Sequence, residues 1–232
     1  MKTEWNPELL EQMRRDWDER ARENARHFVA TGKQDWSDEE FFRSGEAHVR
    51  EQILNDMINI CQSKDPREMR VLEIGCGAGR VTRALAQVFG RVDGVDVSGE
   101  MVARAQEALR DFPGTSAHQN NGVDLRMFSG EEFDFAFSSI VFQHIPSKAV
   151  IENYVGEVRR VLKPGALFKF QAQGVPSEER HCDTWLGVGF TDREMRAMAE
   201  RQGFEMRYAH GAGTQYFWLW FFKRTEQGAE PK

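Results

Sequence analysis

The chain has 232 residues, 40% of them hydrophobic and 29% charged, a composition that excludes collagen-like and wholly disordered proteins. Its formal charge is −6, so the chain as a whole lacks the positive charge that general nucleic-acid binding requires. Its three cysteines have no C-x-x-C spacing and its longest apolar runs are far shorter than the ~20 residues of a membrane helix, which disfavours a disulfide framework, a zinc site and a membrane protein.

Two helices are predicted in the first part of the chain. The first spans Asn6 to about Thr31, because Asn6 can cap it and apolar residues then recur at helical spacing. The second spans Ser37 to about Cys61 and begins with the capping box Ser37-Asp38-Glu39-Glu40. We expect residues 1–64 to form a helical cap or lid over the rest of the chain.

After residue 65, short apolar runs alternate with helical segments, a pattern typical of parallel sheets. The predicted strands are Val71–Ile74, Arg91–Val95, Ser116–Gln119, Phe133–Ile140 and Ala166–Ala172. The predicted helices between them are Ala78–Phe89, Gly99–Asp111 and Ser147–Leu162. Right-handed crossovers between these elements predict a doubly wound, mostly parallel α/β sheet.

The last part of the chain predicts one more helix and a hairpin. The helix begins with a capping box at Thr191 and ends at about Gln202, before Gly203. Two strands, Phe204–Ala209 and Gln215–Lys223, are joined by a short turn containing two glycines, so we expect an antiparallel C-terminal edge hairpin that completes a seven-stranded sheet. Residues 65–224 would form this domain and residues 225–232 a flexible tail.

A glycine-rich turn joins the first predicted strand to its helix, in the sequence Val71-Leu72-Glu73-Ile74-Gly75-Cys76-Gly77-Ala78-Gly79-Arg80. Glycines let such a turn bend sharply and approach a ligand, and the helix end offers unpaired N–H groups. Asp96 ends the second strand, 21 residues after Gly75, where an acidic side chain can accept hydrogen bonds from ribose hydroxyls. Glu73 disfavours a neighbouring pyrophosphate and favours a cationic amine.

These residues resemble the nucleotide motif E-x-G-x-G-x-G of the class I S-adenosylmethionine-dependent methyltransferases. The resemblance continues through Gly94–Ser98, Asn120–Leu125, Phe133–Phe135 and Val161–Leu167, and covers roughly residues 68 to 173. It implies a Rossmann-like methyltransferase fold, S-adenosylmethionine as the cofactor, and a small molecule as the methyl acceptor.

The resemblance also implies which residues hold the cofactor. Gly75 to Gly79 would surround its methionine part, Glu73 would serve the amino group indirectly, and Asp96 would hold the ribose hydroxyls. The full expected set is Glu73, Gly75, Cys76, Gly77, Gly79, Arg80, Asp96, Val97, Met101, Asn121, Gly122, Val123 and Ser138.

Two of these assignments have alternatives. Met101 would pack on the adenine, but methionine fills apolar gaps anywhere, so a plain core position is an equal interpretation. Asn121, with the Gly122-Val123 backbone, would contact the adenine edge, although the family usually has Asp at this position. Asn120 is the competing register.

Ligands of open α/β sheets bind beyond the carboxyl ends of the strands, which here points to the residues just after Ile140. Among them, His144 is a candidate general base, because its ordinary pKa lies near neutrality, and Gln143 is a candidate to orient the acceptor. A base is needed only if the acceptor arrives protonated, since the sulfonium already activates the methyl group. The alternative is that His144 only shapes the pocket.

Four residues are candidate contacts to the acceptor. Trp17 and Phe28 lie on the first predicted helix, which would close over the cofactor. His181 lies in the long connection before Thr191, and Tyr216 lies near the start of the last strand. The alternatives are packing on the sheet for the helix and an ordinary exposed polar loop for His181.

The acceptor is expected to be a small metabolite, methylated on oxygen or nitrogen by in-line displacement that depends mainly on positioning. Ser138-Ser139-Ile140-Val141 stands where methylation of nucleobase or glutamine amino groups uses an N/D-P-P-Y/F motif. Two other functions stay open: a cofactor-binding scaffold or sensor without transfer, and an NAD-dependent oxidoreductase, which the G-x-G-x-G spacing and Glu73 disfavour. We expect a cytoplasmic protein, because the first ten residues contain no apolar signal segment. The charge, the apolar runs and the cysteine spacing described above predict no nucleic-acid, membrane or metal partner. The oligomeric state is left open.

Overall fold

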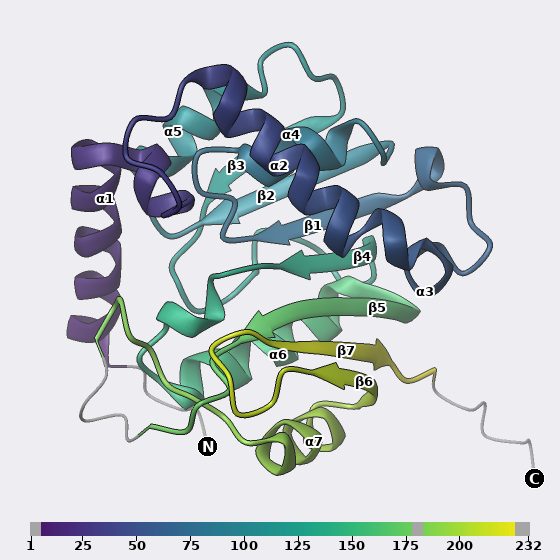
Figure 1. The fold of residues 1–232 in the computed structure, drawn as a ribbon. Coiled ribbons are helices and arrows are strands. Elements are labelled where there is room, and N and C mark those ends of the chain that lie inside the picture. The colour runs from purple at the N-terminus through teal and green to yellow at the C-terminus, as the bar shows by residue number, and fades with distance from the viewer. Residues whose placement is uncertain (1–5, 178–182, 226–232) are drawn as a thin grey trace, which may run out of the picture.

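The computed structural model describes residues 6–177 and 183–225, which form one twisted sheet with helices on both faces (Figure 1). The strands are β1 (Arg70–Ile74), β2 (Arg91–Asp96), β3 (Thr115–Gln119), β4 (Phe133–Ser138), β5 (Leu162–Ala172), β6 (Phe204–His210) and β7 (Phe217–Lys223). The helices are α1 (Pro7–Val29), α2 (Asp38–Gln52), α3 (Met57–Cys61), α4 (Arg80–Ala86), α5 (Gly99–Ala108), α6 (Lys148–Val161) and α7 (Asp192–Arg201). Short 3₁₀ turns lie at Leu54–Asp56, Pro66–Glu68 and Phe142–His144.

The sheet has the strand order β3-β2-β1-β4-β5-β7-β6. β1 pairs in parallel with both β2 and β4, so the winding direction reverses between β1 and β4, and in such sheets ligands bind beyond the carboxyl ends of these strands. β7 runs antiparallel to both β5 and β6. The predicted doubly wound, seven-stranded α/β fold is confirmed, and the antiparallel strand lies second from the edge, inside β6.

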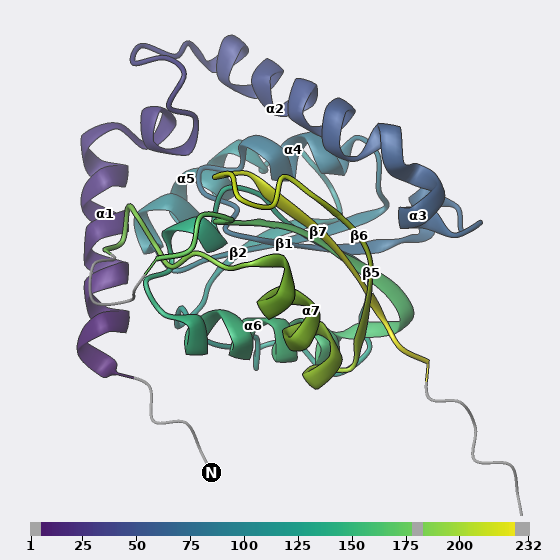
Figure 2. The same cartoon turned by 60° about the horizontal axis from the view of Figure 1, so that its bottom comes forward.

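Helices pack against both faces of the sheet (Figure 2). On one face, α6 and α7 contribute Ile151, Val155 and Met195 to a core that contains the stacked rings of Phe168 and Phe170, 4.3 Å apart. On the other face, the side chains come from α2, α3 and α4. Every residue of β4 is buried, which fits its prediction as a strand covered on both faces. Burial of each large apolar side chain contributes roughly 1.5–3 kcal/mol, so these two cores fix the sheet that carries the site.

The predicted helix caps are present. The Asn6 side chain accepts a hydrogen bond from the Glu8 N–H at the start of α1, and Ser37 and Thr191 form complete capping boxes. α1 has a kink at Asn24, whose φ and ψ are −163° and 81°, and the Asn24 Oδ1 accepts from the His27 N–H beyond it. None of the helices in the described segments is long and apolar enough to cross a membrane.

The single helix predicted over residues 37–61 is wrong, because it is broken at Ile53 into α2, a 3₁₀ turn and α3. The cause lies in the sheet. The Gln52 carbonyl accepts a hydrogen bond of 2.5 Å from the Lys169 Nζ on β5, and Asp56 in the 3₁₀ turn pairs with the same ammonium group at 2.9 Å. A buried cation from another element therefore takes the backbone acceptor near which the helix ends.

Candidate active site

The glycine-rich turn after β1 is held tightly by its neighbours. The Gly75 and Cys76 N–H groups both donate to the Val95 carbonyl, at 2.7 and 3.0 Å. Gly75 has a φ of +76°, and a Cβ there would lie 2.1 Å from the Val141 side chain. Glycine is therefore required at this position both by the backbone conformation and by the space.

Asp96 closes the turn from the end of β2. Its Oδ2 accepts from the Gly77 N–H and its Oδ1 from the Ser98 N–H, each at 2.9 Å. These bonds hold the carboxylate at the pocket surface and leave each oxygen able to accept a further hydrogen bond. Burial raises the pKa of Asp96 above its ordinary value, while the two backbone N–H groups lower it.

Glu73 is the second carboxylate of the pocket and is 5% exposed. Its Oε2 accepts from the Thr82 Oγ1 at 2.6 Å. Burial raises its pKa to about 7, and the hydrogen bond from Thr82 and the nearby charge of Arg80 oppose that rise. A buried carboxyl of this kind gains from a cationic neighbour, which would restore its ionised form.

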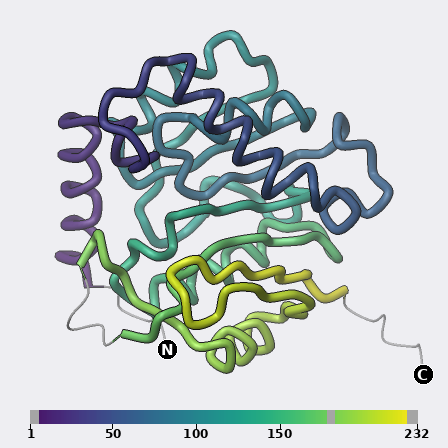
Figure 3. The backbone as a smooth tube through the Cα atoms, viewed as in Figure 1, coloured from purple at the N-terminus to yellow at the C-terminus, as the bar shows by residue number. Residues whose placement is uncertain are grey.

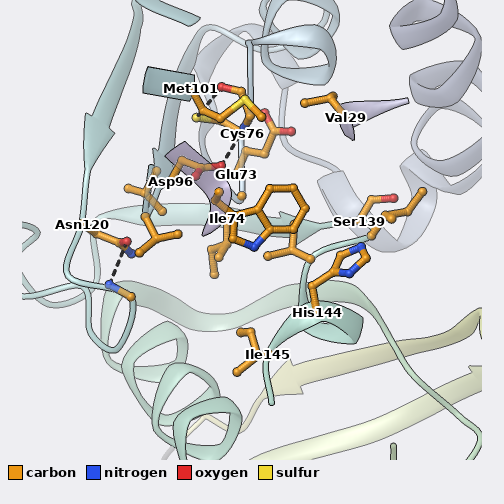
Figure 4. A pocket seen from close by; sticks show the side chains of 18 of the residues that line it. Val29, Glu73, Ile74, Cys76, Asp96, Met101, Asn120, Ser139, His144 and Ile145 are labelled. Atoms are coloured by element: carbon orange, nitrogen blue, oxygen red, sulfur yellow. Dashed lines mark hydrogen bonds between the residues drawn. The ribbon is translucent and has the colours of Figure 1, made fainter. Parts of the chain in front are cut away.

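Around these groups lies a pocket with about 900 Å³ of free space, counting the part that is open to solvent. Figure 4 shows Asp96 and Asn120 on one side and Ser139 and His144 on the other. The residues predicted from the sequence that line it are Trp17, Phe28, Glu73, Gly75, Cys76, Gly77, Arg80, Asp96, Val97, Met101, Gly122 and His144.

At the end of the pocket near Asp96, Asn120 and not Asn121 faces the cavity. The Asn120 Nδ2 donates to the Tyr154 hydroxyl at 2.8 Å, and its Oδ1 accepts from the Gly122 N–H at 3.1 Å. Asn121 is exposed, and its Oδ1 accepts the N–H groups of Val123 and Asp124. The register that the sequence offered as the alternative is the one in which the amide lines the pocket.

A chain of three polar side chains fixes the state of His144. The Gln171 Oε1 accepts from the Ile140 N–H, which fixes the orientation of the amide. The two hydrogens on its Nε2 are shared among the Ala172 carbonyl, the Gln215 carbonyl and the Gln143 Oε1, the last at 2.9 Å. The Gln143 Nε2 therefore points its hydrogens at the His144 Nε2, 3.2 Å away. That nitrogen is an acceptor, so the His144 Nδ1 carries the proton and donates to the Trp185 carbonyl at 2.7 Å.

This network makes His144 a neutral, fully paired side chain. Its burial lowers the pKa to about 4. The lone pair that a general base would use already accepts a hydrogen bond from Gln143. The geometry therefore favours the interpretation in which His144 shapes the pocket over the one in which it removes a proton.

Helix α1 lies beside the segment that follows residue 183 (Figure 3), and its side chains line part of the pocket. The Trp17 ring packs edge-on against the His144 ring at 5.3 Å, and the Phe28 ring against the Trp185 ring at 5.9 Å. The Arg20 guanidinium donates to the Thr184 carbonyl and hydroxyl, each at 3.1 Å, and lies over the Trp17 ring. The first helix thus contributes to the pocket through the side chains predicted for it.

Other residues predicted for the site lie elsewhere. Ser138 is fully buried and its hydroxyl donates to the Ile74 carbonyl, while Gln143 acts through His144. Tyr216 is 52% exposed beside the β6–β7 turn. Gly79 and Val123 lie behind the pocket surface, where Gly79 allows close approach of α5, and His181 lies outside the described residues.

The pocket also contains residues that the sequence did not predict for the site. They are Met13, Val29, Ile74, Val81, Val95, Ser139, Ile140, Val141, Ile145 and Tyr154. Met13 belongs to the apolar stripe of α1, which was a usable signal. Tyr154 looks in the sequence like any core position of α6, and only the fold shows that it supports Asn120.

The chemistry of the pocket suits S-adenosylmethionine. Glu73 and Asp96 offer negative charge and hydrogen-bond acceptors, Arg80 offers a buried guanidinium whose Nε has no partner, and Met101 and Val97 offer apolar surface. A molecule that carries an ammonium, a carboxylate, a ribose and an apolar base matches each of these groups. In the described part of the chain, no group of three or more His, Cys, Asp and Glu side chains is placed to hold a metal ion.

Comparison with known proteins points to a methyltransferase. Residues 71–165 match the model of a methyltransferase domain family. This match and the methyltransferase names of the relatives support a class I S-adenosylmethionine-dependent methyltransferase domain around residues 71–165, less than half of the chain. This methyltransferase domain is 31% identical over 162 residues to the sterol methyltransferase-like 3 of Botryococcus braunii, an alignment that covers 62% of this chain and 40% of that relative. The chain thus spans less than two thirds of the length of the curated relative it matches.

Solved structures extend the likeness of the methyltransferase fold over nearly the whole chain. The DhpI–SAH complex superposes with a TM-score of 0.66 and 18% identity, over 95% of this chain and 99% of that one. Phosphoethanolamine N-methyltransferase 1 of Haemonchus contortus superposes with a TM-score of 0.70 and 14% identity, over 98% of this chain and 52% of that one. The methyltransferase fold therefore includes the N-terminal helices as well as the matched family segment.

Proposed function

We propose that this protein transfers the methyl group of S-adenosylmethionine to an oxygen or nitrogen atom of a small metabolite. The observation that carries the proposal is the pairing of two carboxylates, Glu73 and Asp96, around a glycine turn in one pocket. The match of residues 71–165 to a methyltransferase domain supports the same cofactor.

The residues of the pocket would act mainly by positioning. When bound, S-adenosylmethionine supplies a methyl group on a positively charged sulfur, which is electrophilic without help from the protein. Asp96 accepts hydrogen bonds from the ribose, Glu73 and Arg80 meet the charged end of the molecule, and Asn120 and Met101 contact the base. Holding an acceptor in line at roughly 3 Å can recover several kcal/mol of the barrier.

We also propose that residues 1–64 act as a cap over this site. In the described part, residues 6–64, Trp17 and Phe28 line the pocket and Val29 touches the glycine turn, since a Cβ on Gly77 would lie 2.8 Å from the Val29 side chain. Such a cap excludes water from the reacting atoms and keeps the acceptor next to the cofactor.

The names of relatives do not identify the acceptor. One relative is named for sterols and one structural neighbour for phosphoethanolamine, an apolar and a doubly charged molecule. We therefore infer from the relatives only the class of acceptor, a small molecule, and take its chemistry from the pocket.

The test of this function is titration calorimetry followed by transfer of a radiolabelled methyl group to a metabolite panel. We expect S-adenosylmethionine and S-adenosylhomocysteine to bind and NAD not to bind. Asp96→Asn should weaken the binding at least tenfold, because the ionised acceptor is lost. Glu107→Gln, an exposed change on α5, is the matched control.

Two results would contradict the proposal in different ways. Binding of NAD in place of S-adenosylmethionine would support the oxidoreductase. Tight binding of the cofactor with no transfer to any member of the panel would support the scaffold or sensor.

A further inference from the structure

The half of the pocket away from Asp96 has a distinct character. Among the described residues, Met13, Ile140 and Ile145 give it aliphatic surface, and Trp17 and Phe28 give it aromatic surface. Its polar groups are the Ser139 hydroxyl and the neutral, fully paired ring of His144. A surface of this kind favours an uncharged ligand, because burial of a charge without a partner costs several kcal/mol.

Ser139 is one of four buried polar side chains in the described segments with an unpaired atom, together with His48, Arg80 and Arg159, and it is the hydroxyl among them. Its Oγ is buried and has no hydrogen-bond partner, although it lines the pocket. The neighbouring Ser138 hydroxyl, in contrast, donates to the Ile74 carbonyl at 2.9 Å. A buried, unpaired hydroxyl lowers stability by roughly 1–3 kcal/mol, so a group that completes its hydrogen bond on ligand binding gains that amount.

Four described residues other than glycine have a positive φ, namely Gln62, Ser63, Glu131 and Ile140, and Ile140 is the one with a β-branched side chain. It has a φ of +58°, a left-handed conformation that a β-branched residue adopts only under strain, and its side chain is 36% exposed in the pocket. The strain is held by Gln171, which is fully buried and whose Oε1 accepts the Ile140 N–H at 3.0 Å. Such strain, of order 1–3 kcal/mol, is typical of positions where the backbone serves a ligand site.

The charged groups of the pocket belong to its other half. Asp96 is held by the Gly77 and Ser98 N–H groups, and Arg80 has the charge of Glu73 beside it. Figure 4 shows Ser139 on the opposite side of the pocket from Asp96. Once the cofactor's ammonium and carboxylate meet Glu73 and Arg80, the described lining offers no charged side chain to an ion on the Ser139 side. The nearby Arg20 guanidinium lies outside the lining and donates to Thr184.

We propose that the Ser139 side of the pocket binds an uncharged, mainly apolar molecule with one hydroxyl group. The hydroxyl pairs with the Ser139 Oγ, and the apolar body packs on Ile140, Trp17 and Phe28. Under the proposed function, on which this inference rests, that molecule is the methyl acceptor, whichever of its atoms reacts.

The test uses four probes with the same ring system and different head groups. They are 2-naphthol, 2-naphthoate, 2-(aminomethyl)naphthalene and 2-methylnaphthalene, titrated calorimetrically at neutral pH into the full chain with saturating S-adenosylhomocysteine. We expect 2-naphthol to bind at least tenfold more tightly than the anion or the cation. Tighter binding of an ion, equal binding of all four, or no binding would overturn the proposal.

Two variants test the residues. Ser139→Ala should weaken 2-naphthol five- to tenfold and leave 2-methylnaphthalene unchanged, since only the hydrogen bond is lost. The exposed Ser129→Ala is the control. Ile140→Gly should raise Tm or leave it unchanged, because it relieves the strain, and should weaken both probes, because it removes apolar surface. An Ile140→Gly protein that binds both probes like the wild type would overturn the role of Ile140.

The design separates this inference from the function beneath it. S-adenosylhomocysteine is titrated first, alone, and its failure to bind contradicts the proposed function only. If it binds and the four probes rank differently from the order expected here, the function stands and the acceptor class falls.

Discussion

The burial and charge of a single residue, Glu73, indicate which kind of ligand the site binds. The fold buries this carboxyl next to one hydrogen-bond donor, Thr82, and burial raises its pKa to about 7 even though Thr82 and the charge of Arg80 oppose the rise. A side chain that only stabilised the protein would not be selected for this position, because glutamine would meet Thr82 without the loss of hydration. The charge is explained by a cationic ligand.

This gives a prediction for Glu73→Gln. The folded pKa of about 7 lies above the ordinary 4.5, so the stabilising effect of proton binding is full below pH 4.5 and is lost as the pH rises through 7. We expect the free energy of unfolding of the ligand-free protein to fall between pH 5 and 8, and Glu73→Gln to reduce that fall by up to ~3 kcal/mol. Urea unfolding of both proteins measures it, and identical pH dependences would contradict it.

His144 makes the opposite prediction. Its folded pKa of about 4 lies below the ordinary 6.5, so its contribution to stability is lost as the pH falls from 6.5 toward 4. We expect its ring proton resonances to show no titration between pH 5 and 8. We also expect His144→Gln to lower kcat less than tenfold, since loss of a general base costs 10²–10⁴-fold. A hundredfold loss together with a kinetic pKa near 6.5 would restore the base.

At the scale of elements, α1 is fastened to the rest of the pocket by few polar bonds. The Thr184 hydroxyl accepts a hydrogen bond from the Arg20 guanidinium and donates one to the Asp16 carboxylate, both on this helix. We expect Thr184→Val to weaken these links by about 1 kcal/mol, so the amide hydrogens of α1 should exchange roughly fivefold faster.

Hydrogen exchange measured residue by residue tests this prediction. Thr214→Val, in the exposed β6–β7 turn, is the matched control. Unchanged protection of α1 in Thr184→Val would mean that the aromatic contacts of Trp17 hold the helix without the hydroxyl.

Elements with local signals could be predicted from the sequence, and elements decided by distant contacts could not. The caps at Asn6 and Ser37 and the glycine turn depend on neighbours a few residues away, and the structure contains them. The break at Ile53 depends on Lys169, more than a hundred residues later. No pattern within residues 37–61 contains that information.

The residues of the pocket also fall into those that could be predicted from the sequence and those that could not. Asp96 could be predicted because its distance from Gly75 along the chain follows from the βαβ unit. Whether Ser138 or Ser139, and whether Asn120 or Asn121, faces the cavity depends on one step along the backbone where a strand ends, and local pattern does not determine that step.

At the scale of the whole molecule, the helices before residue 64 and the sheet share their core. Val49, Ile53 and Ile60 pack in one cluster with β1 and β4, and the buried Lys169 on β5 pairs with Asp56 at 2.9 Å. We expect a single cooperative unfolding transition, in which circular dichroism and tryptophan fluorescence coincide. Two separated transitions would mean that residues 1–64 fold as an independent unit.

The same ion pair gives a quantitative test of that coupling. Lys169→Met should destabilise the protein by ~3 kcal/mol, because it leaves the partly buried Asp56 and the Gln52 carbonyl without their cation. Adding Asp56→Leu should recover part of this loss, and the double-mutant cycle measures the coupling by urea unfolding. Strict additivity of the two changes would contradict a working pair.

One turn of α1 touches both halves of the pocket. Asp18 accepts from the Ser98 hydroxyl, and Asp96 accepts from the N–H of the same serine. On the opposite side, Trp17 contacts His144 and Arg20 contacts Thr184. Because this turn of α1 moves as one unit, it cannot leave Ser98 without also weakening its contacts to His144 and Thr184. The spent cofactor and the finished product should therefore share a common departure step, and stopped-flow traces should show both dissociation rates rising together in Thr184→Val. If the two dissociation rates changed independently, the two sides of α1 would move separately.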